Sequence, residues 1–464
     1  MIELKGTSWQ QRYSATQIHT LRCRVVDKPG MLGALCTAIG KAGANIGPID
    51  MVEAEPEHML GDITLYITNA QQLEGVLSAI RDLEGAEIVD VQDDILEIHR
   101  RGSIEMLSRV PIRSQTDLRM LYTPGVAAVC KVVEKDPASA WQWTGICDRI
   151  AIVTNGTAIL GLGDIGPLAG LPVMEGKAAI FAEFVGISGV PILIDTKDPD
   201  EFVDTVVRIS SGFGAIQLED VAAPACFEIE QKLIDRLDIP VFHDDQHGTA
   251  TIVLAALISA LKKTGKKQQD CTVLMLGAGA AGIAISEMLL DFGFQDIVVY
   301  DSKGAIYPGR TDNMNPYKAK LAEITNKKNE KGTLAEGFRG KDVFIGVSRP
   351  DMVSKEMVAS MSNEPIVLPL ANPVGEISTE DAIAAGAAVA ADGRAINNAL
   401  AYPAIFRGAL DARATRITMG MKIAAARRIA ELAGEGELLP DILDRDVHRH
   451  IADAVAAAWG KKGA

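Results

Sequence analysis

The feature that most constrains the fold is a glycine-rich turn at 277–282, Gly-Ala-Gly-Ala-Ala-Gly, which lies between two regular patterns. The apolar run at 271–276 predicts a β-strand, and the pattern at 283–290 predicts an α-helix. This order is typical of a dinucleotide-binding fold, in which the turn and the helix N-terminus hold the pyrophosphate. We therefore expect the cofactor to contact Gly277, Gly279, Ala280, Ala281 and Gly282.

A second predicted strand at 297–300 ends at Asp301, 24 residues after Gly277. An acidic residue about 20 residues beyond the turn binds the ribose 2′-hydroxyl and disfavours a 2′-phosphate. The spacing therefore favours NAD over NADP as the cofactor. Nearby Lys303 could offset the repulsion, which leaves NADP open, and Asp301 could also be an ordinary acid at a strand end.

Two acidic pairs precede the glycine turn. Glu219-Asp220 follows the apolar run 215–218, and Asp244-Asp245 follows the run 239–242. Four carboxylates at the ends of two strand-like runs would repel one another unless a cation lay among them. Hard oxygen ligands suit Mg²⁺ or Mn²⁺. An acidic pair alone is usually a solvated loop, so the metal prediction depends on both pairs occurring with the nucleotide turn.

Composition excludes several classes of partner. A net charge of −15 over 464 residues argues against nucleic acid and anionic membranes, which would repel the chain. The six cysteines lack paired spacing and are typical of reduced thiols in a cytosolic protein. The N-terminus lacks an apolar signal region, and the longest clean apolar stretch, 252–261, is too short to span a bilayer. We expect a soluble, cytoplasmic protein.

The chain is long enough for several domains and predicts an α/β fold throughout. Residues 17–100 have strands at 20–26, 46–54, 61–68 and 86–98 and helices at 31–42 and 71–83, the βαββαβ order of a ferredoxin-like domain. Residues 101–250 form a second domain, and residues 251–415 form a Rossmann-like dinucleotide-binding domain. The Ala-rich segment 416–464 predicts terminal helices that pack on the body.

Within 101–250 we expect a helix at 117–135 and a strand at 150–154. The glycine loop at 160–166 is a weak phosphate signal, because no clear helix follows it in the sequence.

The first domain resembles the ACT family of small-molecule regulatory domains. The resemblance depends on the turn at 27–30, Asp-Lys-Pro-Gly, the following Met-Leu-Gly-Ala-Leu, and Gly-Ala-Asn-Ile at 43–46. It implies an effector site at Pro29, Gly30, Met31, Leu32 and Asn45, where an amino acid or carboxylate could dock at a helix start. The alternative is a domain that only mediates dimerisation. Exposed strand edges favour pairing with a second copy in either case.

Eight motifs from 101 to about 430 are similar, in order, to those of the small bacterial malic enzymes. They are YTPGVA at 122–127, ILGLGD at 159–164, MEGKA at 174–178, DTKDPD at 195–200, LED at 218–220, HDDQHGT at 243–249, ANP at 371–373 and NNAL at 397–400. The resemblance implies a substrate and metal domain at 101–250 and oxidative decarboxylation of L-malate to pyruvate and CO₂ with NAD or NADP and a divalent metal. We also expect a homodimer or larger homo-oligomer.

The resemblance assigns chemistry to individual residues. Lys177 matches the family's base, which takes the proton of the C2 hydroxyl as hydride leaves C2. Tyr122 matches the acid that protonates enolpyruvate at C3. Without the resemblance, Lys177 would be interpreted as a surface lysine and Tyr122 as a packed aromatic residue. A dication and burial would lower the pKa of Lys177, whereas Asp244, also assigned to the catalytic group, would raise it.

The remaining assignments concern the metal, the cofactor and the substrate. The family's metal ligands are matched by Glu219, Asp220 and Asp245, and the metal would stabilise charge on the C2 oxygen during decarboxylation. Cofactor binding is assigned to Ser348 and Asn372, and substrate binding to Asn372, Asn397 and Asn398.

One departure from the family affects the carboxylate clamp. Larger eukaryotic members carry an arginine just before the ILGLGD motif, where this chain has Ala158. The clamp is therefore expected elsewhere, with Arg149 or a residue of a second subunit as candidates. Two other functions stay open: a 2-hydroxy-acid dehydrogenase that stops at the keto acid and needs no metal, and a non-catalytic metabolite sensor. The retained set of Tyr122, Lys177 and three ligand carboxylates argues against a decayed enzyme.

Overall fold

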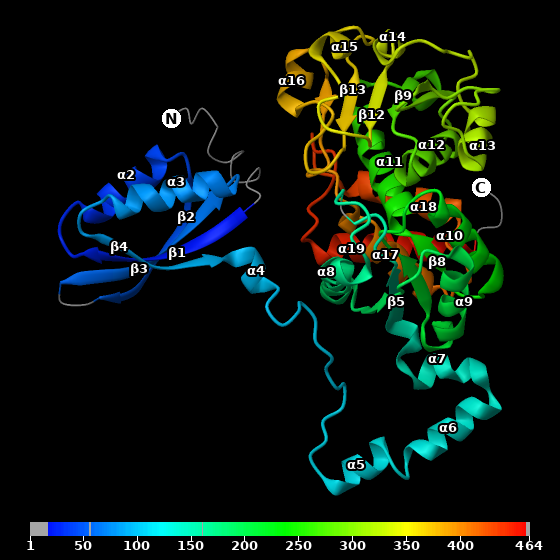
Figure 1. Ribbon diagram of the computed structural model, residues 1–464. Helices are drawn as coiled ribbons and strands as arrows, with labels where there is room; N and C mark the ends of the chain where they lie inside the picture. Colours follow the sequence, from blue (N-terminus) through cyan, green and yellow to red (C-terminus); the bar gives the residue numbers. More distant parts are fainter. Residues whose placement is uncertain (1–16, 55–56, 160, 461–464) are drawn as a thin grey trace. The chain divides into compact units, whose positions relative to one another are not determined.

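The computed structural model describes residues 17–54, 57–159 and 161–460 (Figure 1). These residues belong to two compact units, one ending at Glu105 and the other beginning at Met106. The first unit contains β1 (Gln17–Val26), α2 (Met31–Lys41), β2 (Asn45–Ala54), β3 (His58–Ile67), α3 (Ala70–Arg81) and β4 (Ala86–Asp93). Its antiparallel sheet has the order β2-β3-β1-β4. This is the expected βαββαβ fold.

One face of this sheet forms the core of the first unit. Leu21, Cys23 and Val25 alternate along β1 and are at most 4% exposed, and they pack with Leu35 and Ile39 of α2. The predicted strand 86–98 was too long, because β4 ends at Asp93 and a short helix α4 (Asp94–Ile98) follows. The Asp93 carboxylate accepts the N–H groups of Ile95 and Leu96 and so caps that helix.

The second unit contains two sheets. The first is parallel, in the order β6-β5-β7-β8, with β5 (Arg149–Thr154), β6 (Ser188–Leu193), β7 (Ala215–Leu218) and β8 (Val241–His243). The helices along this part of the chain are α8 (Pro167–Val185), α9 (Pro199–Ile209) and α10 (Ala225–Arg236). Strands β5, β7 and β8 are almost completely buried, as expected for a parallel sheet, whereas the edge strand β6 is only partly buried.

The second sheet has the order β11-β10-β9-β12-β13-β14. Its strands are β9 (Thr272–Leu276), β10 (Asp296–Asp301), β11 (Gly304–Ala305), β12 (Val343–Gly346), β13 (Ile366–Pro369) and β14 (Val389–Ala390), and only β11 runs antiparallel. The α-helices that belong to it are α12 (Ala280–Phe292), α13 (Pro316–Ile324), α14 (Leu334–Phe338), α15 (Lys355–Ala359) and α16 (Thr379–Ala384). This is the expected Rossmann-like arrangement.

A long buried helix, α11 (Asp244–Thr264), begins at the first sheet and packs on α12 of the second. The C-terminal helices are α17 (Tyr402–Asp411), α18 (Met419–Leu432) and α19 (Arg445–Trp459). Helix α18 packs on α11, and α17 and α19 pack on α8. Among the described residues, no helix combines the length and the apolar character needed to cross a bilayer.

Two local expectations in the second unit were wrong. The predicted helix 117–135 is two helices, α5 (Gln115–Leu121) and α6 (Val126–Lys135). Pro124 lacks the N–H that the interior of a helix needs, so the helix ends before it. The turn that follows suits glycine, because a Cβ on Gly125 would lie 2.6 Å from the Arg119 carbonyl. A short helix α7 (Ala140–Trp143) follows. A helix does follow the glycine loop: α8 starts at Pro167, a favoured residue for the first helical turn.

Candidate active site

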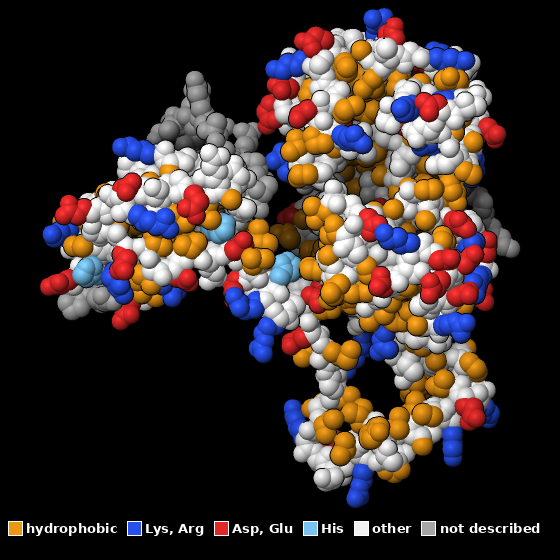
Figure 2. All heavy atoms as spheres, in the orientation of Figure 1, with side chains coloured by type: hydrophobic (Ala, Val, Ile, Leu, Met, Phe, Trp, Pro, Cys, Tyr) orange, Lys and Arg blue, Asp and Glu red, His pale blue; other side chains and the backbone are white. Residues whose placement is uncertain are grey.

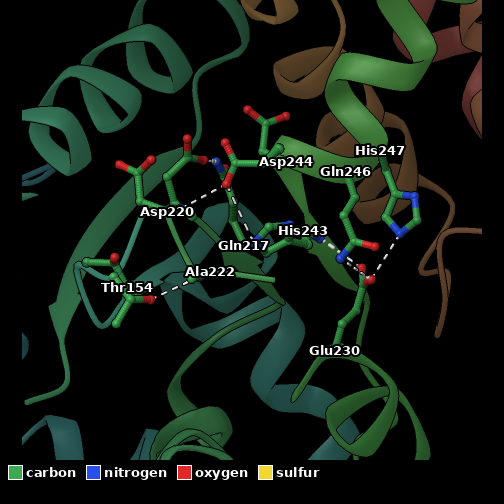
Figure 3. A network of polar contacts seen from close by, with 12 residues as sticks. Thr154, Gln217, Asp220, Ala222, Glu230, His243, Asp244, Gln246 and His247 are labelled. Atoms are coloured by element: carbon green, nitrogen blue, oxygen red, sulfur yellow. Dashed lines mark hydrogen bonds and ion pairs between the residues drawn. The ribbon is translucent and has the colours of Figure 1, made fainter. Parts of the chain in front are cut away.

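The two acidic pairs come together at one edge of the four-stranded sheet. Glu219 and Asp220 directly follow β7, and Asp244 and Asp245 begin α11 directly after β8. Because β7 and β8 are parallel neighbours, their carboxyl ends meet at the same edge, where ligands bind in open α/β sheets. In Figure 3 the side chains of Asp220 and Asp244 lie above Gln217 and His243.

Three of these carboxylates form a cluster. Oxygen atoms of Glu219, Asp220 and Asp245 all lie within 4.8 Å of one another. Burial raises the pKa of Glu219 to about 7 against the attraction of Lys177, and burial likewise raises the pKa of Asp245 to about 6. Carboxylates held together in this way retain protons unless a cation replaces them, and oxygen ligands suit hard cations. The donor set therefore fits a divalent cation such as Mg²⁺ or Mn²⁺.

Hydrogen bonds fix the cluster to the strand ends. Gln217 Nε2 donates to Glu219 Oε2 at 2.6 Å, and the Asp220 N–H donates to Asp245 Oδ2 at 2.9 Å. The Ala158 N–H donates to the Asp220 carbonyl at 3.1 Å. Asp220 adopts a φ of +54°, in the left-handed region that Asp tolerates better than most residues. The carboxylates are thus positioned by the backbone of two strands.

Lys177 from α8 reaches the same cluster. Its Nζ donates to the Asp244 carboxylate and lies 3.1 Å from Glu219 Oε1. Burial alone would lower the pKa of Lys177, but the carboxylates of Asp244 and Glu219 outweigh it and raise that pKa well above its ordinary value. Asn398 Nδ2 also donates to Asp244, at 2.8 Å. The structure therefore gathers Lys177, Asp244 and Asn398, which lie far apart in the sequence.

Behind the first turn of α11 lies a buried glutamate that the sequence did not single out. Glu230 of α10 accepts the His243 N–H at 2.9 Å and Gln246 Nε2 at 3.1 Å, and it lies 3.0 Å from His247 Nε2 (Figure 3). Lys422 Nζ of α18 lies 3.1 Å from His247 Nδ1. Neutral His247, with its proton on Nε2, satisfies both contacts. Nothing in the spacing of Glu230 and Lys422 along the sequence indicates that both contact His247.

The glycine turn has the geometry that its sequence predicts. Gly277 has a φ of +119°, and a Cβ there would lie 2.7 Å from the Val347 carbonyl. A Cβ on Gly282 would lie 1.9 Å from the Gly277 carbonyl, so only glycine lets the helix approach the strand. A Cβ on Gly279 would meet no atom within 4 Å, which leaves room for a phosphate, and α12 starts at Ala280.

Asp301 stands at the end of β10, as expected, but its carboxylate is already engaged. It accepts from Arg310 at 2.6 Å, Lys318 at 2.8 Å, Asn313 at 3.0 Å and the Lys303 N–H at 2.8 Å. Its side chain is only 6% exposed. The two cations beside it are therefore Arg310 and Lys318, which the sequence did not indicate. A ribose contact of Asp301 stays a prediction.

The other expected cofactor and substrate residues lie on loops of the second sheet and on the short helix at Asn398–Leu400. The Ser348 and Ala371 N–H groups donate to the two oxygens of fully buried Glu376, at 2.7 and 3.2 Å. A Cβ on Gly161 would lie 3.5 Å from the Asn372 carbonyl, so the glycine loop of the first sheet approaches this region. The side chain of Asn397 caps the short helix.

Two expected residues lie away from this centre. Tyr122 follows α5 and is 67% exposed, and no side chain of α5 or α6 is buried. In Figure 1 these two helices lie apart from α8, which carries Lys177. Arg149 is not supported as the carboxylate clamp, because it is exposed at the N-terminal end of β5, whereas the acidic cluster lies at the carboxyl ends.

In the first unit, Gly30 has a φ of +92° and precedes α2, where Met31 is the first residue. Leu32 is 40% exposed and lines a small apolar cavity together with residues of β1, β2 and β3. A separate groove of about 1020 Å³ between α2 and α3 is lined by small and polar residues. It includes none of Pro29, Gly30, Met31, Leu32 and Asn45, which stay the predicted effector residues.

The structure combines a Rossmann-like sheet and glycine turn with a cluster of three carboxylates beside a largely buried lysine. Helix α11 connects the two parts. These features define the class of metal-assisted, dinucleotide-linked enzymes. Comparison with known proteins specifies the family. The malic enzyme N-terminal domain matches residues 101–234, the malic enzyme NAD binding domain matches residues 246–459, and an ACT domain matches residues 14–92. The chain belongs to the malic enzyme family and carries an N-terminal ACT domain, as the two resemblances implied.

Individual relatives are similar to this protein over most of its chain. The NAD-dependent malic enzyme of Geobacillus stearothermophilus is 44% identical over 439 residues, which are 92% of this chain and 91% of the relative. The NADP-dependent malic enzyme of Escherichia coli is 44% identical over 375 residues, 79% of this chain but 47% of the relative. The crystal structure of an NAD-dependent malic enzyme from Thermotoga maritima superimposes with a TM-score of 0.75 at 40% identity, covering 78% of this chain and 98% of that one.

Proposed function

We propose that the protein oxidises L-malate with NAD and decarboxylates the product to pyruvate and CO₂, using Mg²⁺ or Mn²⁺. The observation that carries the proposal is the contact of Lys177 with Asp244 and Glu219 beside the cluster of three carboxylates. Both relatives named above as NAD- and NADP-dependent malic enzymes support the reaction. A dehydrogenase that stops at the keto acid is not favoured, because it would have no use for the clustered carboxylates.

In this proposal Glu219, Asp220 and Asp245 hold the cation. Once bound, the cation would act as a Lewis acid on the oxygen at C2 of the substrate. Lys177 must lose its proton before it can accept one from the C2 hydroxyl. Positive charge among the carboxylates would oppose the effect of Asp244 and Glu219 on the pKa of Lys177, so cation binding and activation of the base are coupled. Asp244 and Asn398 orient Lys177.

We further propose that the acid Tyr122 is supplied by a second copy of the chain. In a single chain Tyr122 is exposed and lies on an arm, residues 106–143, that has many exposed apolar side chains, and Figure 2 shows hydrophobic side chains gathered over α5 and α6. The most exposed of them are Met106, Leu107, Met120 and Tyr122, at 64% to 95%. An apolar arm of this kind is typical of an interface between subunits. A homodimer would bury the arm and bring a tyrosine to each centre. A cytoplasmic location agrees with the free thiols of all six cysteines.

The reaction is tested with the full-length protein, L-malate and Mn²⁺, first with NAD and then with NADP. NADH, pyruvate and CO₂ should form in equal amounts, and a chelator should abolish turnover. Oxidation without CO₂, or activity that persists after metal removal, would favour the simple dehydrogenase instead.

The shared centre is tested by mixing two inactive variants, Lys177→Ala and Tyr122→Phe. If each centre takes its lysine from one subunit and its tyrosine from the other, a mixed dimer has one intact centre of two. Random exchange should then restore roughly a quarter of the wild-type activity, because about half of the dimers are mixed. No recovery after verified exchange would place both residues in one subunit and refute the proposal.

A further inference from the structure

Tyr402 is a buried aromatic residue that touches Lys177 directly. It is the first residue of α17, and its side chain is 0% exposed. Lys177 Nζ lies 4.4 Å from the centroid of its ring. The ring also meets Phe181 of α8 edge to face, with 5.0 Å between centroids. Tyr402 is therefore held on one side by apolar packing and presents a ring face to the amine of Lys177.

The environment of Lys177 is asymmetric. Asp244 and Glu219 supply negative oxygens, and Tyr402 supplies an uncharged but electron-rich face. An aromatic face attracts a cation by about 0.5–2 kcal/mol, with the higher values at sites shielded from water. Lys177 is only 12% exposed. The ring and the two carboxylates therefore contact Nζ together.

We propose that the ring of Tyr402 is a positioning residue for Lys177 in malate oxidation. The role depends on the proposed function of Lys177 as the base. The ring face lies 4.4 Å from Nζ and is held by its packing against Phe181. A ring held in this way limits where the end of the Lys177 side chain can lie. It also keeps Nζ at the carboxylates instead of letting the flexible side chain leave them.

The hydroxyl group of Tyr402 is not part of this role. Its oxygen is buried and has no hydrogen-bond partner among the described residues. A buried hydroxyl without a partner is destabilising, so removing it should not weaken the fold. Phenylalanine keeps the ring and removes only the hydroxyl, whereas leucine removes the aromatic face and keeps an apolar side chain. The two substitutions therefore separate the ring from the hydroxyl.

The experiment compares full-length Tyr402→Phe, Tyr402→Leu, Lys177→Ala and a control, Phe181→Leu. Phe181 is equally buried and packs against Tyr402, and no cation–π contact joins it to Lys177 among the described residues. Each variant is measured for malate oxidation, for decarboxylation of added oxaloacetate, which needs no proton removal from the C2 hydroxyl, and for melting of the protein without ligands.

We expect Tyr402→Phe to keep kcat within about 3-fold and to melt at the same or a higher temperature. Tyr402→Leu should lower kcat for malate oxidation by about 2- to 30-fold, the loss of the cation–π interaction expressed as a rate. It should keep the KM for malate and the decarboxylation of oxaloacetate within about 3-fold. Phe181→Leu keeps the ring of Tyr402 and removes part of its support, so it should lower malate oxidation less than Tyr402→Leu does.

Three results would overturn the role of the ring: equal losses in Tyr402→Phe and Tyr402→Leu, an unchanged kcat in Tyr402→Leu, or equal losses of both reactions in Tyr402→Leu. If Lys177→Ala abolishes oxidation while Tyr402→Leu keeps it, only the role of Tyr402 fails. If Lys177→Ala itself keeps malate oxidation, the assigned base fails and the role of Tyr402 fails with it.

Discussion

Replacing Glu230 should weaken metal binding, although its carboxylate is not part of the cluster of Glu219, Asp220 and Asp245. Glu230 accepts from His243 and Gln246 and contacts His247, so it holds the turn that presents Asp244 and Asp245. Without this acceptor, three donors of one helical turn lose their buried partner. Groups that orient metal ligands in this way typically change metal affinity by about 10- to 100-fold. We expect a loss in that range for Glu230→Ala.

The effect on stability follows from the charge of Glu230. Burial would raise its pKa, but contact with His247 and attraction to His243 and Lys422 outweigh burial and lower the pKa to about 2 from an ordinary 4.5. A pKa lowered in this way means that ionised Glu230 stabilises the folded state. Because the folded pKa is the lower one, the contribution is complete above about pH 5 and disappears as the pH falls toward 2.

Lys422 makes the loss larger in Glu230→Ala. It is 6% exposed, and the attraction of Glu230 is the largest effect that favours its charged form, so Glu230→Ala leaves a buried cation without that support. The double variant Glu230→Ala with Lys422→Met should therefore regain part of the stability, but not the metal affinity. Glu228→Ala on the same helix is the control, because Glu228 pairs with Lys232 at the surface and should matter little.

The assay is urea unfolding between pH 8 and pH 4 together with titration of the metal-free protein with Mn²⁺, followed by electron paramagnetic resonance. The gap in stability between wild type and Glu230→Ala should narrow as the pH falls below about 5, where Glu230 of the wild type becomes protonated. Mn²⁺ binding by Glu230→Ala within 2-fold of wild type would refute the reasoning, as would a gap in stability that widens in acid.

Three further predictions concern the metal, the cofactor and the first unit. Asp245→Ala should abolish metal-dependent turnover while NADH binding, followed by fluorescence, stays nearly intact; wild-type turnover would remove Asp245 from the metal site. Asp301→Ala should increase the use of NADP relative to NAD, because Arg310 and Lys318 would be free to attract a 2′-phosphate; an unchanged ratio of kcat/KM values would mean that Asp301 does not face the ribose. A chain that begins at Arg101 should keep basal activity and lose any effector response. Such a response in the full chain would be a coupling of about 1–3 kcal/mol, or 5- to 150-fold in malate affinity. If a screen of amino acids and central-pathway acids affects both forms equally, the ACT domain has no regulatory role.

Local patterns were sufficient for the fold of each part. The strand, glycine turn and helix at 271–290 predict a local geometry that depends on residues close in sequence, and Gly277 and Gly282 have the steric contacts that this geometry requires. The ferredoxin-like order of the first unit likewise follows from alternating apolar residues and turns. Where prediction was wrong, at 122–125 and at 94–98, a proline-glycine turn and an aspartate cap end the regular structure. At each of these boundaries, a local turn or cap residue outweighed the pattern that predicted a longer helix or strand.

The sequence by itself determined which chemical groups are present: the carboxylates beside β7 and β8, the lysine of α8, the glycine turn and the family they resemble. Tertiary structure alone decided which of them meet. Lys177 reaches Asp244 and the ring of Tyr402. Glu230 reaches His247, which in turn contacts Lys422, and Asp301 is paired with Arg310 and Lys318. These contacts join residues from different helices, strands and loops, and they are strong because burial shields them from solvent. Burial and distance depend on how whole elements pack, and no spacing along the chain encodes them.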